Sequence, residues 1–226
     1  MNILDQLQLA TEKQIRFRKR QLGQSFAFPS EYKSKLEAIK HLTSRDGRER
    51  MLSIYSVFGE LFITEYTIGS DQAVRSKEAI AAKMQSINQK RVKLIITAQG
   101  KSYTKFIDTE KAMKMSKRID LLVSYHTHPI HTEGEKQTWG FFSVTDLMTF
   151  ITNNKLLATG LITKSYWLLL KTDNFTNLDY NMYNQIYTDL IHSGEHNFTR
   201  LISFLNQSGL LVYQSANGST YNLRQA

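Results

Sequence analysis

The chain of 226 residues has no cysteine and no uninterrupted apolar run of about 18 residues. The lack of cysteine excludes disulfide scaffolds, thiolate zinc sites, iron–sulfur clusters and a cysteine nucleophile, so any metal must be held by histidines and carboxylates. The lack of a long apolar run excludes a membrane span, and the N-terminus lacks the apolar core of a secretory signal, so we expect a cytoplasmic protein. An apolar content of 41% with 22% charged residues is typical of a globular domain with its own core.

Acidic residues are scarce, with 20 Asp and Glu against 29 Lys and Arg and a net charge of +9. The basic excess is concentrated in residues 75–118, which hold twelve basic and three acidic residues. Such a segment attracts nucleic acid, anionic lipid or an acidic protein, or it only keeps the surface soluble. Its aromatic residues are Tyr103 and Phe106 alone, too few to favour a platform on which single-stranded bases stack.

Hydrophobic periodicity and turn residues predict alternating helices and strands, and hence a mixed α and β domain. The predicted helices cover residues 1–20, 31–45, 72–90, 108–118, 143–154, 178–191 and 197–206. The predicted strands cover residues 25–29, 51–58, 60–68, 92–98, 103–107, 121–128 and one or two strands in 158–172, with a terminal hairpin of 209–215 and 219–224. The basic residues that end the first helix make it a candidate for docking on the domain or on a partner.

The candidate metal-ligating residues lie in two short motifs that follow an apolar strand. His126 and His128 are two residues apart in an extended segment, so both imidazoles point to one side. Asp146 lies three residues after Ser143, on the first turn of a predicted helix with Ser143 as its cap. Two histidines and one carboxylate make a three-ligand zinc set that leaves a fourth position open, which is typical of hydrolytic sites.

With these motifs the chain resembles the JAB/MPN metallopeptidases, whose JAMM motif is an upstream Glu, then His-x-His-Pro, then Ser-x-x-Asp. The resemblance covers roughly residues 24–172. It includes SFAFP, the helix EYKSKLEAIKHL, the Glu49 strand and the later strand GLITKSYWLLLKT. It implies an α+β fold of the cytidine-deaminase-like type, with a mixed sheet flanked by helices. The expected organisation is an N-terminal helix over 1–22, the metallopeptidase domain over 23–173, and C-terminal helices with a hairpin over 174–226.

The resemblance also implies a role for each motif residue. His126, His128 and Asp146 would bind Zn²⁺, Glu49 would act as general base, and Ser143 would donate to the oxyanion of the tetrahedral intermediate. The sequence leaves Glu60 as a competitor for the base, although Glu49 is favoured because it directly precedes an apolar strand.

Two features depart from the family pattern. Leu52 replaces the Gly that usually follows the Glu by three residues, and fourteen residues, 129–142, separate His128 from Ser143 where the family usually has about seven. This long loop, which contains His131, Glu133, Glu135 and Trp139, is expected either to shape or cover the site or to be a surface insertion.

The expected function is that of a zinc-dependent isopeptidase similar to deubiquitinases, acting after the tail of a ubiquitin-like modifier. The alternatives are a scaffold subunit of a larger assembly, docked through the N-terminal helix or the C-terminal extension, and a nucleic-acid-associated relative. Retention of all five motif positions favours the enzyme, whereas the basic residues of 75–118 motivate the third possibility.

Overall fold

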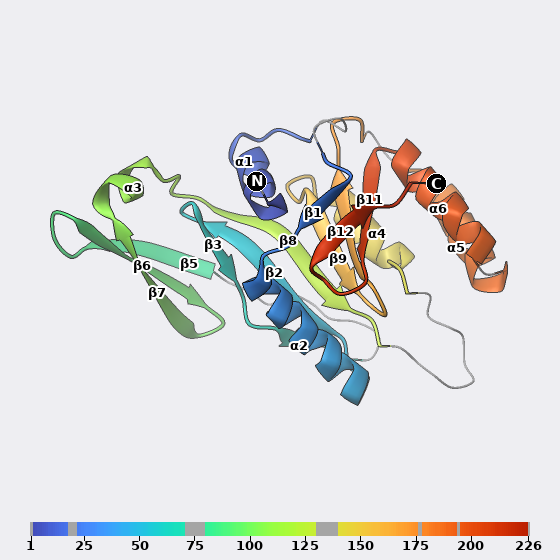
Figure 1. The fold of residues 1–226 in the computed structure, drawn as a ribbon, viewed down its shortest axis with the longest axis horizontal. Coiled ribbons are helices and arrows are strands. Elements are labelled where there is room, and N and C mark those ends of the chain that lie inside the picture. The colour runs from blue at the N-terminus through green and yellow to red at the C-terminus, as the bar shows by residue number, and fades with distance from the viewer. Residues whose placement is uncertain are drawn as a thin grey trace.

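The computed structural model describes residues 2–17, 22–70, 80–129, 140–175, 178–193 and 195–225. Its body is one mixed sheet of nine strands in the order β1-β12-β11-β10-β9-β8-β2-β3, with β4 paired to β2 (Figure 1). The strands of the body are β1 (Ser25–Ala27), β2 (Arg50–Val57), β3 (Glu60–Ile63), β4 (Thr67–Ile68), β8 (Ile119–Thr127), β9 (Ala158–Ile162), β10 (Tyr166–Lys171), β11 (Leu210–Ser215) and β12 (Thr220–Leu223). The β8–β9 pair is parallel and the others are antiparallel, which confirms a mixed sheet flanked by helices.

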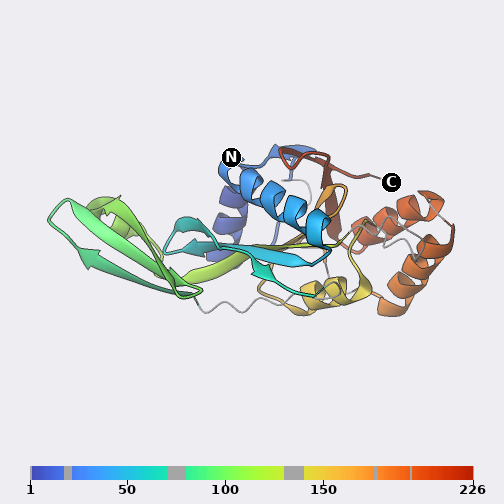
Figure 2. The same cartoon turned by 90° about the horizontal axis from the view of Figure 1, so that it is seen from below.

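Helices cover both faces of this sheet. They are α1 (Ile3–Glu12), α2 (Ser30–Asp46), α4 (Val144–Thr152), α5 (Tyr180–Ser193) and α6 (Glu195–Gln207). Figure 2 shows α2 on one face and α4 on the other. Alternation along β10 supplies both faces, because Leu168 and Leu170 pack with α1 and α2 while Trp167 and Leu169 pack with α4, α5 and α6. No helix in the described part of the chain is long and apolar enough to cross a membrane.

Two hydrophobic cores lie on the two faces of the sheet, and all three segments expected from the sequence (1–22, 23–173 and 174–226) contribute residues to them. The apolar face of α1, with Leu4 and Leu7 fully buried, belongs to the same core as α2. The terminal strand β12 pairs with β1 near the other end of the chain, with Phe26 opposite Tyr221. The apolar side of the N-terminal helix is therefore already covered by its own domain.

The segment between β4 and β8 forms an arm that projects from the body (Figures 1 and 2). It contains the antiparallel sheet β5-β6-β7, with β5 (Ile80–Ser86), β6 (Arg91–Ala98) and β7 (Lys101–Asp108), followed by the short helix α3 (Thr109–Lys114). The predicted hairpin around Gln99-Gly100 is confirmed.

The prediction of a helix over 72–90 is wrong for residues 80–86, which form β5, while residues 71–79 lie outside the described residues. In β5, Ile80, Ala82 and Met84 alternate with exposed residues and pack toward the core of the arm. Pairing with β6 along the whole of β5 satisfies the backbone and outweighs the helical propensity of alanine, methionine and glutamine.

Two glycines have positions that the fold requires. Gly47 ends α2 in the left-handed conformation with a φ of 68°, and its N–H donates to the carbonyl of Thr43, as the Asp46-Gly47 break predicted. Gly160 on β9 lies against the buried ring of Tyr125 on β8, and a Cβ there would come within 2.1 Å of that ring. The second contact keeps β8 close to β9 at the residue that precedes His126.

Candidate metal centre

The side chains of His126, His128 and Asp146 meet at the C-terminal end of β8. His126 is the second-last residue of the strand and His128 follows its end, so the pleat points both rings to the same side. Their Nε2 atoms are 3.2 Å apart. From α4, which packs on the face of the sheet to which His126 points, Asp146 places Oδ1 3.2 Å from Nε2 of His126 and Oδ2 3.2 Å from Nε2 of His128. The structure thus brings together the three residues predicted as metal ligands.

Glu49 approaches the same cluster from β2. Met51 pairs with His126, and continuing this antiparallel ladder by two residues places Glu49 opposite His128. Oε1 of Glu49 lies 3.9 Å from Nε2 of His128, and the Glu49 residue is 7% exposed.

The competing carboxylate, Glu60, lies at the opposite end of β2. It pairs in register with Val57, and its oxygens form ion pairs with Lys105 and Lys111 of the arm. At about 3.3 Å per residue, the two ends of β2 are about 23 Å apart. Glu60 is therefore too far from His126 and His128 to serve them.

Ser143 caps α4 and also orients the Asp146 carboxylate. Its backbone N–H and its hydroxyl both donate to Oδ2 of Asp146, at 2.8 and 2.7 Å, and the N–H of Asp146 donates back to the Ser143 oxygen at 3.2 Å. This is a reciprocal capping box. The predicted cap is confirmed, and the same contacts hold the carboxylate toward the two histidines.

The surroundings of Asp146 keep its carboxyl group ionised. Burial by itself would raise the pKa of Asp146, but the charges and hydrogen bonds of His126 and His128 outweigh this effect and hold the pKa well below its usual range. Asp146 is therefore an anionic oxygen donor at neutral pH.

The three side chains are close enough together to share a metal ion. At metal–ligand distances of about 2.0–2.1 Å, a tetrahedral set keeps its ligand atoms about 3.3 Å apart. The two imidazole nitrogens have this spacing, at 3.2 Å, whereas the two 3.2 Å contacts of Asp146 use different oxygens, Oδ1 toward His126 and Oδ2 toward His128. With one ligand atom from each residue, the three atoms lie within 4.8 Å of one another, so this cluster of described residues could hold a metal ion. Each Nε2 faces another imidazole nitrogen and a carboxylate oxygen, an arrangement of electron-pair donors that a cation satisfies.

A hydrogen-bond network that the sequence did not reveal fixes the strand ends beneath the cluster. Thr127, between the two histidines, accepts from the N–H of Arg50 at 2.8 Å and lies 2.7 Å from the hydroxyl of Thr43 on α2. The buried guanidinium of Arg50 in turn donates to Asp46 and to the carbonyl of Arg48. The hint in the sequence is the Asp46–Arg50 spacing across a helix end, but such charge pairs are common and most are solvated.

Lys171 anchors the C-terminal end of α4, the helix that carries Asp146. Its side chain is fully buried, and its ammonium donates to the carbonyls of Phe150 and Asn153 at 2.7 and 2.8 Å. Burial lowers the pKa of Lys171 to about 8, and the nearby charge of Arg16 adds to the effect. A cation at a helix C-terminus is favourable, so the two ends of α4 are fixed by Lys171 and by Ser143.

We expect Lys171→Met to lower the free energy of unfolding by about 2 kcal/mol, because two buried carbonyls lose their donor. The pKa of Lys171 is lower in the folded state, so the unfolded chain binds more protons between about pH 8 and pH 10 and the wild-type stability rises across that window. Urea unfolding at pH 7, 8, 9 and 10 measures both effects. The exposed Lys155→Met should change stability by less than about 0.5 kcal/mol. An unchanged pH slope in Lys171→Met would contradict this assignment.

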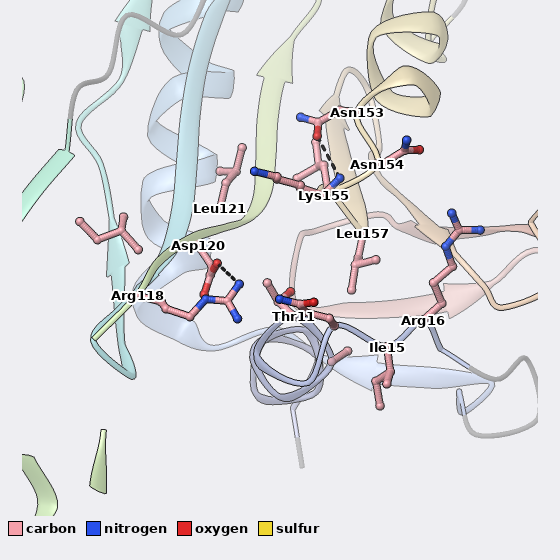
Figure 3. A pocket seen from close by; sticks show the side chains of 14 residues that line it. Thr11, Ile15, Arg16, Arg118, Asp120, Leu121, Asn153, Asn154, Lys155 and Leu157 are labelled. Atoms are coloured by element: carbon pink, nitrogen blue, oxygen red, sulfur yellow. Dashed lines mark hydrogen bonds and ion pairs between the residues drawn. The ribbon is translucent and has the colours of Figure 1, made fainter. Parts of the chain in front are cut away.

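A separate cavity of about 570 Å³ lies at the other end of β8. Its walls come from the end of α1, the start of β8 and the segment after α4, and Arg118 and Asp120 form an ion pair of 2.9 Å on the β8 wall (Figure 3). None of its lining residues belongs to the metal-ligating cluster of the described residues. The cavity is thus distinct from the candidate metal centre.

The structure describes only the two ends of the loop 129–142. Residues 130–139, with His131, Glu133, Glu135 and Trp139, lie outside the described residues. After them, Phe141 and Phe142 are buried, and the carbonyl of Phe142 accepts from the hydroxyl of Tyr183 on α5 at 2.9 Å. This contact secures the segment that leads into Ser143.

No protein-family model matches the chain, and neither the curated proteins nor the solved structures give a match. The interpretation of the centre therefore depends on its own geometry. That geometry is a cluster of two imidazoles and one carboxylate that could hold a metal ion, with a second carboxylate 3.9 Å from one imidazole.

Proposed function

We propose that the protein is a zinc-dependent metallopeptidase of the JAB/MPN type, which cleaves an isopeptide or peptide bond after the tail of a ubiquitin-like modifier. The observation that supports this most directly is the convergence of His126, His128 and Asp146, in which the two imidazole nitrogens are 3.2 Å apart and each is 3.2 Å from an oxygen of Asp146. A site with three protein ligands leaves a position open for water or substrate, as hydrolytic zinc sites do.

Glu49 is the proposed general base. When bound, zinc would bring the pKa of a coordinated water toward about 7 and polarise the scissile carbonyl. Glu49 is the carboxylate beside the three ligands, with Oε1 3.9 Å from His128 Nε2, so it can accept a proton from that water and return it to the leaving amine. Its low exposure keeps bulk water from competing for this proton.

Ser143 is the proposed oxyanion donor. Its hydroxyl donates to Asp146 at 2.7 Å, while the backbone N–H of Ser143 contacts the same oxygen. Rotation of the hydroxyl toward a substrate oxygen leaves the backbone contact in place, so Ser143 can stabilise the tetrahedral intermediate while the carboxylate stays oriented.

The substrate class comes from the resemblance of the motifs and from the fold. Family substrates present an extended tail whose backbone pairs with a strand and whose small residues pass the metal. A modifier whose tail ends in small residues is the proposed substrate.

The test uses full-length protein purified without chelators. We expect about one zinc per chain by elemental analysis, and hydrolysis of isopeptide-linked peptides whose acyl side ends in Gly-Gly. Treatment with a chelator should abolish the hydrolysis and added Zn²⁺ should restore it. Hydrolysis that is insensitive to chelation, or a protein with neither metal nor hydrolysis, would overturn the proposal.

A further inference from the structure

The arm has two different sheet faces. In register, Val92 pairs with Ile107 and Ile96 with Tyr103, so these side chains share one face. That face packs on α3 and the β2–β3 hairpin, where the Tyr103 ring lies 5.1 Å from the ring of Phe62. One face of the arm is thus a small hydrophobic core.

The opposite face, which we call the outer face, has no partner among the described residues. Lys93 on β6 is paired with Phe106 on β7, and Lys83 on β5 and Arg91 on β6 point to the same side by alternation. Phe106 is 64% exposed, and Lys83 and Arg91 are exposed as well. An aromatic ring thus stands in water beside three cations.

The charge of the arm is largely uncompensated. Residues 80–118 contain ten Lys and Arg and two Asp and Glu. Ion pairs occupy Lys105 and Lys111, both with Glu60, and Arg118 with Asp120. The other seven cations form no ion pair with a described residue, and Lys83, Arg91 and Lys93 of the outer face are among them. The arm therefore presents an unneutralised positive surface well away from the metal centre (Figure 1).

The composition of the outer face favours one kind of polyanion. Protein interfaces have an apolar centre and few lysines, whereas nucleic-acid interfaces are polar and strongly positive. Around Phe106 and the three cations the outer face carries the hydroxyls of Thr97, Ser102 and Thr104 and only Ile95 as a large aliphatic residue. Its edge also carries the carboxylate of Asp108, which is opposite Arg91 in register, so the face has a net charge of +2. Hydroxyls and cations contact phosphates, and an exposed ring stacks on a base.

We propose that the outer face of the β5-β6-β7 sheet binds single-stranded nucleic acid mainly through its phosphates, with one stacking ring and not the platform of several rings that the sequence lacks. Lys83, Arg91 and Lys93 contact phosphates and Phe106 stacks on one base. Since only one ring is available, the binding tolerates different sequences and depends mainly on charge. This surface is independent of the proposed hydrolysis.

Fluorescence anisotropy of a labelled 20-nucleotide thymidine strand, with the full-length protein, tests the proposal. Three phosphate contacts predict a logarithmic salt slope of about −2, which is a loss of about 20-fold in affinity between 50 and 200 mM salt. The triple change Lys83→Gln, Arg91→Gln and Lys93→Gln should weaken binding at least 10-fold, and Phe106→Ala about 5-fold or more. Zinc content should stay unchanged in both variants.

The matched control changes three other unpaired cations, Lys101→Gln, Lys114→Gln and Lys117→Gln. Lys101 belongs to the inner face by register, and Lys114 and Lys117 lie in or after α3. Equal weakening by the two triple variants would overturn the outer face as the binding surface. If poly-glutamate binds as tightly as the thymidine strand, the partner of the outer face is an acidic protein and the proposal of nucleic acid is overturned. Absent or salt-insensitive binding of the thymidine strand would also overturn it. If the triple variant does not fold, the single variant Lys93→Gln takes its place in the comparison with the control.

Discussion

Glu49→Gln should lower the turnover number for isopeptide hydrolysis by about 10²–10⁴-fold and leave the zinc content near one per chain. The amide has the size of the carboxylate but cannot accept the proton of the attacking water. The zinc is retained because Glu49 stands outside the ligand triangle, 3.9 Å from His128 Nε2. Steady-state kinetics and elemental analysis of the same preparation give both quantities.

The matched control is Glu60→Gln, which makes the same chemical change at the other end of β2. Its carboxylate pairs with Lys105 and Lys111 on the arm, so its loss should affect the attachment of the arm but not hydrolysis. Equal activity of Glu49→Gln and the wild type, with zinc bound in both, would show that Glu49 is not the base.

Asp146→Asn should reduce zinc affinity at least 100-fold and remove hydrolysis with it. The substitution replaces an anionic ligand by a neutral amide, a larger loss than the 10–100-fold typical of residues that only orient a ligand. The amide oxygen can still accept from the N–H of Ser143, so α4 keeps much of its cap. Competition with a fluorescent zinc chelator measures the affinity.

Ser143→Ala tests whether the cap of α4 also supports metal binding by Asp146. It removes the hydroxyl that donates to Asp146 and accepts from the Asp146 N–H, so we expect a loss of stability of about 1 kcal/mol and a 10–100-fold loss of zinc affinity. Wild-type zinc affinity in Asp146→Asn would exclude Asp146 as a ligand, whatever the result for Ser143→Ala.

The cluster of His126, His128 and Asp146 could be predicted because its signals are local. The pleat alone places His126 and His128 on one side of β8, and the capping pattern places Asp146 on the first turn of α4. The approach of α4 to this end of β8 could not be derived from one sequence. It depends on the parallel β8–β9 pair and on the packing of α4, which are long-range contacts.

The choice between Glu49 and Glu60 also required the register. Both residues lie beside apolar strands, and the sequence offers no means to count pairs between β2 and β8. The pairing of Met51 with His126 decides between them, because it places Glu49 at the site and Glu60 about 23 Å away.

The arm shows where sequence patterns fail. Residues 80–86 combine good helix formers with a two-residue alternation of only seven residues, and the pairing with β6 decides between them. Likewise, the support of Thr127 by Thr43 and Arg50 joins residues 84 and 77 positions apart. No local pattern encodes such a contact.

The central claim is that His126, His128 and Asp146 share one zinc ion. A crystal of full-length protein measured on both sides of the zinc absorption edge tests it directly. We predict a single anomalous peak within about 2.1 Å of Nε2 of both histidines and of a carboxylate oxygen of Asp146. A zinc-loaded crystal with no peak among these three side chains, or with its peak at other residues, would contradict the account.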